Sequence, residues 1–337
     1  MTQKITFVGW YGRQNAGDEA FKEVHKLLFN GRCDIEWADD KAQVTTSPGQ
    51  RYVLGGGDVL NNFYAKHIPA DQPFALYGVG VGGEEEFGFI SQHQDRIPAA
   101  WVRNDRDAQR LVASGLNAHF TPDIVFQLKS LYADSKARDP AGAAGRKRLV
   151  LFLSANAFQD ALRTGNERLI HYYGFFQREL ALVCDFLSDY YDVVFYPLST
   201  NVNDDDHLFS TQVHGFMRKA ERARVLPGRD EIEEIVQMVK AADLVMTMKF
   251  HGIVFSILSE RPFVNVGLSR KTQLLSADNG LGQLSLDPYC MSYHKAAAAI
   301  KHAESPAVRQ QVAEVSRRLY EQASAQGQAF RDFILGS

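Results

Sequence analysis

Apolar runs of strand length alternate with stretches of helical periodicity along almost the whole chain, and this alternation limits the possible folds most strongly. In the first third, residues 20–29 and 105–114 show the spacing of apolar side chains that is typical of helices. The strand-like runs around them cover residues 5–10, 33–38, 51–56, 74–82 and 99–104. Strands that alternate with helices form a mostly parallel sheet with both faces covered. The sequence therefore predicts an α/β fold.

A polar segment rich in alanine, glycine and charge, residues 135–146, interrupts this alternation and is the predicted linker. Strands and helices alternate again after it, and the tail from 306 to 335 has the pattern of one long amphipathic helix. We therefore predict two Rossmann-like domains, 1–135 and 146–305, with a cleft between them. The segment 306–337 is expected to pack back across that cleft. Ligand sites in such sheets lie beyond the carboxyl ends of the strands.

Composition excludes several classes of function. The chain has 337 residues, and its net charge of −3 gives no sign of nucleic-acid binding. No apolar stretch is long enough to span a bilayer, and the first residues lack the features of a signal peptide. Cys33, Cys184 and Cys290 lie far apart, which favours a reducing compartment over a disulfide framework or a zinc site. We expect a cytoplasmic protein without a bound metal.

The loop after the first strand, residues 9–19, leads into the first helix and contains Gly9, Gly12 and Gly17. Glycines allow tight turns and close approach of a ligand to the backbone, and a helix N-terminus offers free N–H groups. However, Asp18 and its neighbour Glu19 would repel a phosphate. An equally good interpretation is a plain turn with acidic residues at the start of the helix.

Glycines also follow two later strands. Gly55, Gly56 and Gly57 would let a ligand approach, and Asp58 and Asn61 could contact sugar hydroxyls. The structural alternative is a strand–helix turn capped by Asp58.

The second run, residues 78–82, is followed by three glutamates at 84–86. We interpret these glutamates as a solvated helix start and not as a metal site.

Arg103 lies at the end of a predicted strand, where a guanidinium group can bind a carboxylate or a phosphate with two parallel hydrogen bonds. Asn104 or Asp105 is expected to cap the next helix. The alternative for Arg103 is a salt bridge to Asp105 or Asp107.

Lys249 and His251 stand where the strand-like run 243–248 ends and an apolar helix begins. The helix N-terminus attracts anions and lowers the pKa of a nearby histidine, so that His251 would serve as a neutral base. Arg270 and Lys271 follow the next predicted strand. These groups predict a site for a small ligand with two negative groups, although a lone histidine before an apolar helix is more often structural.

Taken together in this order, seven motifs resemble the polysaccharide pyruvyl transferase family. They are the G-Y-Y-G-x-x-N-x-G-D-E-A-like loop at 9–20, the glycines with Asp58 at 55–58, the Y-G-x-G-x-G strand end at 77–82, the V-R-D-x-x-S-like segment at 102–107, the T-x-D-like step at 121–123, the R-x-H-like segment at 249–251, and Lys271. Three positions depart from the family pattern: Asn104 replaces an aspartate, Asp107 a serine and Lys249 an arginine.

The resemblance implies a fold similar to the two-domain glycosyltransferase-B architecture and phosphoenolpyruvate as the donor, with no cofactor. It implies that a sugar hydroxyl of a polysaccharide, or of its lipid-linked precursor, receives the pyruvyl group as a ketal, and that the enzyme contacts a membrane only peripherally. The first domain would be the acceptor side and the second the donor side.

The implied roles are general acid and base for His251 and stabilisation of the leaving phosphate for Lys271 and Arg103. The remaining substrate-binding candidates are Lys249, Arg270, Asn15, Gly17, Asp18, Gly55, Gly56, Gly57, Asp58 and Asn61. Two alternatives stay open. One is a glycosyltransferase of the same architecture that uses a nucleotide sugar, and the other is a non-catalytic relative that binds a carbohydrate or a nucleotide.

Overall fold

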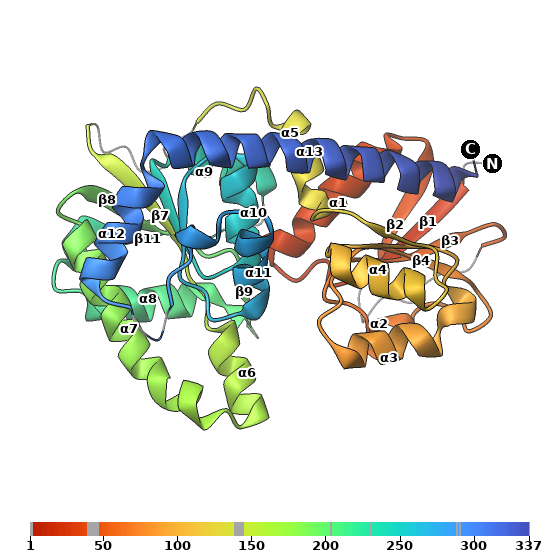
Figure 1. The fold of residues 1–337 in the computed structure, drawn as a ribbon, viewed down its shortest axis with the longest axis horizontal. Helices are drawn as coiled ribbons and strands as arrows, with labels where there is room; N and C mark the ends of the chain where they lie inside the picture. Colours follow the sequence, from red (N-terminus) through yellow and green to blue (C-terminus); the bar gives the residue numbers. More distant parts are fainter. Residues whose placement is uncertain are drawn as a thin grey trace. The chain divides into compact units, whose positions relative to one another are not determined.

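The computed structural model describes residues 3–38, 47–137, 145–202, 204–228, 231–287, 289 and 291–336. The chain forms two compact units, each with its own parallel sheet (Figure 1). The first unit is Met1–Leu131 together with Arg318–Ser337, and the second is Tyr132–Arg317. Part of the predicted linker, 138–144, lies outside the described residues.

The sheet of the first unit contains six parallel strands in the order β2-β1-β3-β4-β5-β6. Its strands are β1 (Gln3–Val8), β2 (Cys33–Ala38), β3 (Arg51–Gly57), β4 (Phe74–Val79), β5 (Ala100–Val102) and β6 (Ala118–Phe120). The prediction of a parallel α/β sheet is confirmed for this unit. Only β6 was not predicted, because its three residues include His119 and, unlike those of β5, do not lie in an apolar run.

Helices cover both faces of this sheet. One face packs against α2 (Asn62–Ala65), α3 (Glu84–Gln92) and α4 (Asp105–Ala113), whose apolar residues share one buried cluster with the strands (Figure 1). The helix α1 (Ala16–Phe29) contacts the short helices η2 (Ile124–Gln127) and α5 (Leu128–Leu131). The helix η1 (Gln94–Arg96) follows α3.

The long terminal helix α13 (Pro306–Leu335) has the bounds that the sequence predicted, and it contributes to both units. Its residues from Arg318 onward belong to the first unit, where the ring of Phe330 stacks on Tyr77 with 3.8 Å between the ring centroids. Near its end, the carbonyl oxygen of Ile334 accepts a hydrogen bond from Gln3 at 3.3 Å. The last turns of α13 therefore complete the core of the first unit.

The sheet of the second unit contains five parallel strands in the order β11-β8-β7-β12-β13. They are β7 (Lys147–Phe152), β8 (Tyr191–Phe195), β11 (Ala223–Val225), β12 (Leu244–Thr247) and β13 (Phe263–Asn265). A small antiparallel hairpin, β9 (Thr200–Asn201) with β10 (Asp204–Asp205), follows β8. The predicted restart of the strand–helix alternation is confirmed.

Two groups of helices accompany this sheet. The helix α7 (Glu167–Leu187) packs with α6, α8 and α12, and α10 (Phe250–Leu258) packs with α9 and α11. The bounds of the other helices are α6 (Asn156–Thr164), α8 (Asp206–Phe216), α9 (Ile232–Ala241), α11 (Arg270–Asp278), α12 (Tyr293–Ala303), η3 (Ala220–Arg222) and η4 (Gly282–Leu284).

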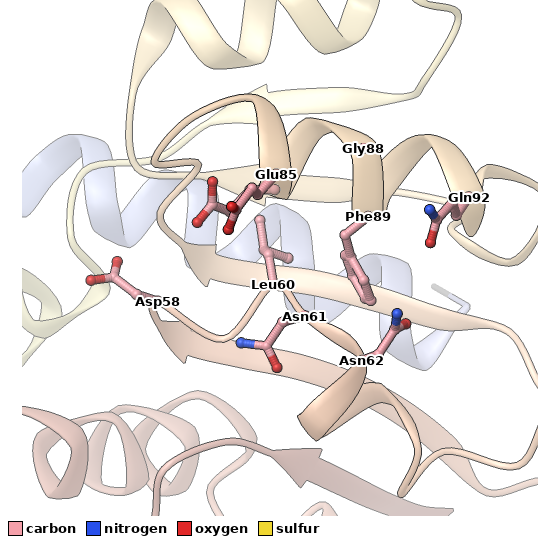
Figure 2. Close-up of a pocket in the computed structure, with 9 residues that line it drawn as sticks. Asp58, Leu60, Asn61, Asn62, Glu85, Gly88, Phe89 and Gln92 are labelled. Atoms are coloured by element: carbon pink, nitrogen blue, oxygen red, sulfur yellow. The ribbon is translucent and has the colours of Figure 1, made fainter. Parts of the chain in front are cut away.

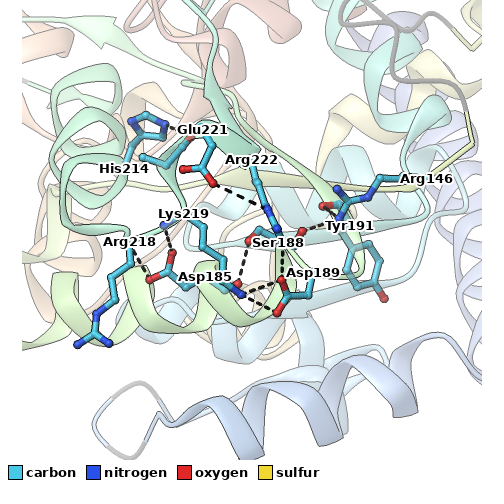
Figure 3. A network of polar contacts seen from close by, with 11 residues as sticks. Arg146, Asp185, Ser188, Asp189, Tyr191, His214, Arg218, Lys219, Glu221 and Arg222 are labelled. Carbon is cyan, nitrogen blue, oxygen red and sulfur yellow. Dashed lines mark hydrogen bonds and ion pairs between the residues drawn. The ribbon is translucent and has the colours of Figure 1, made fainter.

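A dense network of charges at the end of α7 has a structural role (Figure 3). The carboxylate of Asp185 accepts hydrogen bonds from the backbone N–H groups of Arg218 and Lys219, both at 2.9 Å. Asp189 pairs with the side chains of Lys219 at 2.6 Å and Arg222 at 2.5 Å. These contacts fix the segment before β11 to α7, which accounts for the charges without a ligand.

Candidate active site

The strand order determines where each sheet can hold a ligand. In the first unit the order reverses between β1 and β3, and in the second it reverses between β7 and β12. At such a switch point the loops after neighbouring strands diverge, which leaves a crevice at the carboxyl ends of the strands. The crevice of the second unit lies beside the residues that follow β12, and these include Lys249 and His251.

Lys249 is buried between two carboxylates. It is the N-cap residue of α10, and its Nζ lies 2.8 Å from Asp206 and 3.1 Å from Asp204. Asp206 is completely buried and also accepts a hydrogen bond from the backbone N–H of Ser199 at 2.9 Å. The sequence predicted a cation at this edge of the sheet, and the structure places it between the carboxylates of Asp204 and Asp206.

The ionisation of this cluster depends on the balance of burial and charge. Burial disfavours the charged form of Lys249, but Asp206 and Asp204 outweigh it and raise the pKa of the lysine. Burial also raises the pKa of Asp206 to about 7, although Lys249 acts in the opposite direction. Near neutral pH the cluster therefore carries a net charge between zero and −1, and an arriving anion must compete with Asp204 and Asp206 for the lysine.

His251 is the second residue of α10, and it is half-buried. Its ring lies against Phe250 and Phe255, with centroid distances of 5.4 and 6.4 Å, and its Nε2 is buried. Gly252 follows without a side chain because a Cβ there would overlap the side chain of Thr247. The first turn of α10 therefore packs directly on the end of β12.

Arg270 and Lys271 open α11, which follows β13, and both side chains are exposed. Because β13 pairs directly with β12 and α11 contacts α10, these cations lie at the same edge of the sheet as Lys249 and His251. The structure thus groups all four candidates of the second unit. Their convergence on one ligand stays a prediction.

The first unit holds a similar cluster around Arg103, which follows β5. Its guanidinium group lies 2.6 Å from Asp58 and 3.2 Å from Asp123, and the Asp123 side chain is fully buried. Burial opposes the charge of Arg103, but the two carboxylates outweigh this effect and raise its pKa. The sequence analysis named neither aspartate as a partner of Arg103. The assignment of Arg103 to the leaving phosphate stays a prediction.

The glycines at the end of β3 and just after β4 lie against the protein's own side chains. Gly56 has a φ of +78°, and a Cβ there would overlap the ring of Phe21. A Cβ at Gly80 would overlap the guanidinium group of Arg103. Gly57 has a φ of +84°, and a Cβ there would lie 3.2 Å from the Asp18 carboxylate, which is a tight contact. Packing alone therefore requires small residues here, whatever ligand binds.

The other candidates of the first unit also have local roles. The carbonyl of Gly55 accepts a hydrogen bond from the Tyr11 hydroxyl, and Asn15 caps α1 by accepting one from the N–H of Gly17 at 3.1 Å. Asn61 caps α2, so the alternative in which Asp58 is the cap is wrong. Asn104 caps α4, as expected.

The sequence matches the profile of one known family over residues 17–270, and that family is described as polysaccharide pyruvyl transferase. The match covers well over half of the chain. The chain belongs to the polysaccharide pyruvyl transferase family. The family resemblance predicted from the ordered motifs is thus confirmed, and the chain is a member of a transferase family.

Solved structures similar to this polysaccharide pyruvyl transferase family member support its fold class. The S. aureus MnaA–UDP co-structure has a TM-score of 0.64 at 10% identity, covering 100% of this chain and 97% of that chain. UDP-GlcNAc 2-epimerase from Neisseria meningitidis, bound to UDP-GlcNAc, has a TM-score of 0.63 at 9% identity, with 97% and 99% covered. WaaG, a glycosyltransferase involved in lipopolysaccharide biosynthesis, has a TM-score of 0.53 at 12% identity, with 99% and 100% covered.

These likenesses confirm the predicted α/β, glycosyltransferase-B-like fold class. No protein of curated function matches the sequence. Among the described residues, no helix has the length and apolar character needed to cross a membrane. In the same part of the chain, no three His, Cys, Asp or Glu side chains are grouped so that they could hold a metal ion.

Three acidic residues of this polysaccharide pyruvyl transferase family member were missed as parts of the candidate site. Asp204 and Asp206 come from an acidic run after β8, and Asp123 follows the Thr121–Pro122 step. Each binds a basic residue that is distant in the sequence. The available signal was that Asp123 follows closely after β6 and that the acidic run lies in the connection after β8, where polar side chains collect at the binding edge of a parallel sheet.

Proposed function

We propose that this protein transfers the pyruvyl group of phosphoenolpyruvate to two hydroxyls of a sugar in a polysaccharide or its lipid-linked precursor, forming a pyruvate ketal. Family membership supports a transferase. The observation that carries the proposal is the grouping of His251 and three basic residues at the carboxyl ends of β12 and β13. Phosphoenolpyruvate has a phosphate and a carboxylate, and an edge with several cations suits such a ligand.

The reaction proceeds in three steps. A proton is added to the methylene carbon of phosphoenolpyruvate, and positive charge develops at the carbon that bears the phosphate. A sugar hydroxyl attacks this carbon and loses its proton. Phosphate then leaves with its bonding electron pair, and a second sugar hydroxyl attacks the same carbon and gives up its proton to close the ketal, so that of the two hydroxyl protons one balances the proton added to the methylene carbon and the other leaves with the phosphate. No electrons are exchanged with a redox partner.

His251 is the proposed acid and base of these proton transfers, because the imidazole ring is the side chain best suited to accept and donate protons near neutral pH. Lys271 and Arg270 are exposed and would hold the charged groups of the donor. Lys249 would act with them once the anion displaces Asp204 from its Nζ.

A nucleotide sugar is the competing donor, because two of the similar structures were solved with UDP or UDP-GlcNAc. The two donors are separated by thermal shift measurements with phosphoenolpyruvate and with UDP, GDP and CMP sugars, with and without EDTA. We expect phosphoenolpyruvate alone to raise the melting temperature, with no effect of EDTA. A shift with nucleotide sugars only would exclude the proposed donor.

For His251→Ala we expect turnover of phosphoenolpyruvate to fall by about 100- to 10,000-fold, the usual effect of removing a positioned acid or base. Donor affinity should change much less. The half-buried ring between Phe250 and Phe255 would also suit a purely structural histidine, so melting temperature is measured on the same sample.

His171→Ala is the matched control, because His171 is exposed on α7 of the same unit. It should leave both turnover and melting temperature unchanged. A folded His251→Ala protein with normal turnover would remove this residue from the mechanism.

A further inference from the structure

The first unit contains a cavity of about 410 Å³ between α2 and α3, at the carboxyl ends of β3 and β4 (Figure 2). This volume lies within the range of small-molecule sites. Leu60 and Phe89 are largely buried and contribute a small apolar area to the wall, and polar side chains surround them. The cavity is next to the Arg103 cluster, because Asp58 both lines the cavity and pairs with Arg103.

Three amide side chains line the cavity and retain hydrogen-bonding capacity. The oxygen of Asn61 accepts a hydrogen bond from the backbone N–H of Phe63 at 3.0 Å, and the oxygen of Asn62 lies 3.1 Å from His93 Nε2. Within the described residues neither amide nitrogen makes a hydrogen bond, so both can donate to a ligand. Gln92, the third amide, makes no side-chain hydrogen bond within the described part of the chain.

Three carboxylates complete the lining: those of Asp58, Glu85 and Glu86. Within the described residues, Glu85 and Glu86 form no ion pair, and none of the residues that line the cavity is basic. Glu84 is different, because it pairs with Arg110 at 2.8 Å and does not line the cavity. The cavity is thus rich in acceptors and negatively charged.

This combination suits a sugar without a negative charge. Carboxylates and amide oxygens accept hydrogen bonds from hydroxyls, amide nitrogens donate to them, and an apolar surface accommodates the C–H face of a sugar ring. A carboxylate or phosphate on the ligand would lie within a few ångströms of unpaired glutamates. Each such like-charge contact costs about 1 kcal/mol in water and more where solvent is partly excluded.

We propose that this cavity binds an uncharged sugar unit of the acceptor and discriminates against sugars that carry a carboxylate or a phosphate. The inference rests on the proposed function, because a saccharide acceptor is the second substrate which that reaction requires. It adds the class of acceptor and the residues that select it.

The test measures sugar binding directly, without phosphoenolpyruvate, by saturation-transfer NMR on the full chain. The probes are methyl glucoside, methyl galactoside, methyl mannoside and methyl glucuronide. We expect at least one neutral glycoside to bind and the glucuronide to bind at least about tenfold more weakly at low salt. The double variant E85Q/E86Q should reduce the difference in binding between the neutral glycoside and the glucuronide. Asn62→Ala should weaken binding of the neutral glycoside. E84Q is the matched control and should change neither.

Several results would overturn the proposal. They are no binding of any neutral glycoside, equal binding of the glucuronide, or an unchanged preference in a folded E85Q/E86Q protein. Binding of a polyamine in place of sugars would also overturn it. Because phosphoenolpyruvate is absent from this test, the two failures can be told apart: a failed pyruvyl transfer assay with intact sugar selectivity would reject the proposed function, and with it the role of the sugar as acceptor, but not the selectivity of the cavity for uncharged sugars.

Discussion

Each unit of the molecule places one basic side chain between two aspartates at the carboxyl edge of its sheet, yet the two clusters differ in exposure. In the first unit Arg103 binds a fully buried Asp123 and an Asp58 that is 55% exposed. In the second unit Lys249 binds a fully buried Asp206 and an Asp204 that is only 16% exposed. The first cluster is open to solvent on one side, whereas the second is closed on both.

The two clusters also differ in how their charges respond to pH. A guanidinium group stays ionised and can bind both of its aspartates at once. In the second cluster burial raises the pKa of Asp206 to about 7, so a proton can neutralise it near physiological pH. The first cluster therefore keeps its cation, whereas the charge of the second depends on pH through Asp206.

The largest expected effect is on stability, and it comes from Arg103→Met. This change leaves the carboxylate of Asp123 buried without its cation, which lowers the free energy of unfolding by about 3–5 kcal/mol. Trp10, Trp37 and Trp101 all belong to the first unit, so the urea midpoint of tryptophan fluorescence measures this unit.

The double variant R103M/D123N is the control for this prediction. It removes both buried charges, and it should recover much of the lost stability. If Arg103→Met alone has the same urea midpoint as the parent, the ion pair of Arg103 does not stabilise the first unit.

A smaller, pH-dependent effect is expected from Asp206→Asn. The raised pKa means that the folded state keeps a proton on Asp206 that the unfolded chain loses above about pH 4. The stabilising contribution is complete below that pH and is lost as the pH rises to about 7, at about 1.4 kcal/mol per pH unit. Asparagine cannot titrate, so the variant should gain stability relative to the parent over this range.

Urea unfolding followed by far-UV circular dichroism at pH 5, 6 and 7 measures this slope. Asp205→Asn is the matched control, because Asp205 caps α8 and an asparagine can still cap it. Its stability difference from the parent should not depend on pH in the same way. A flat difference for Asp206→Asn would show that both clusters stay ionised.

The smallest effect is expected from Asp58→Asn. The carboxylate is more than half exposed, and Arg103 keeps Asp123, so the first unit should lose less than about 1 kcal/mol of stability. The measurement is again tryptophan fluorescence in urea, and added salt should reduce the loss further. A loss as large as that of Arg103→Met would mean that Asp58, and not Asp123, holds the arginine.

The sequence predicted the elements of this fold well because each has a local pattern. Periodic apolar residues predicted α13 to the residue, and the apolar run that contains β12 placed His251 at a strand end. Ion-pair partners lack such a pattern. Asp58 and Arg103 are 45 positions apart, and Asp206 and Lys249 are 43 apart, so only the folded topology brings them together.

The acceptor cavity shows the same limit. The run 84–86 was interpreted as a solvated helix start, and α3 does begin at Glu84. Nothing in three successive glutamates separates the one that pairs with Arg110 from the two that face a cavity. That separation depends on how α3 is rotated about its axis, and tertiary packing sets this rotation.

Because the last turns of α13 belong to the first unit, the two units become complete at different times during synthesis. The second unit, Tyr132–Arg317, is uninterrupted, so its sheet can close as soon as that segment leaves the ribosome. The first 131 residues must wait for Phe330, which stacks on Tyr77, until the 198 residues between them have been made. At usual rates of translation this takes roughly 10–40 s, during which one apolar face of the older unit is available to chaperones.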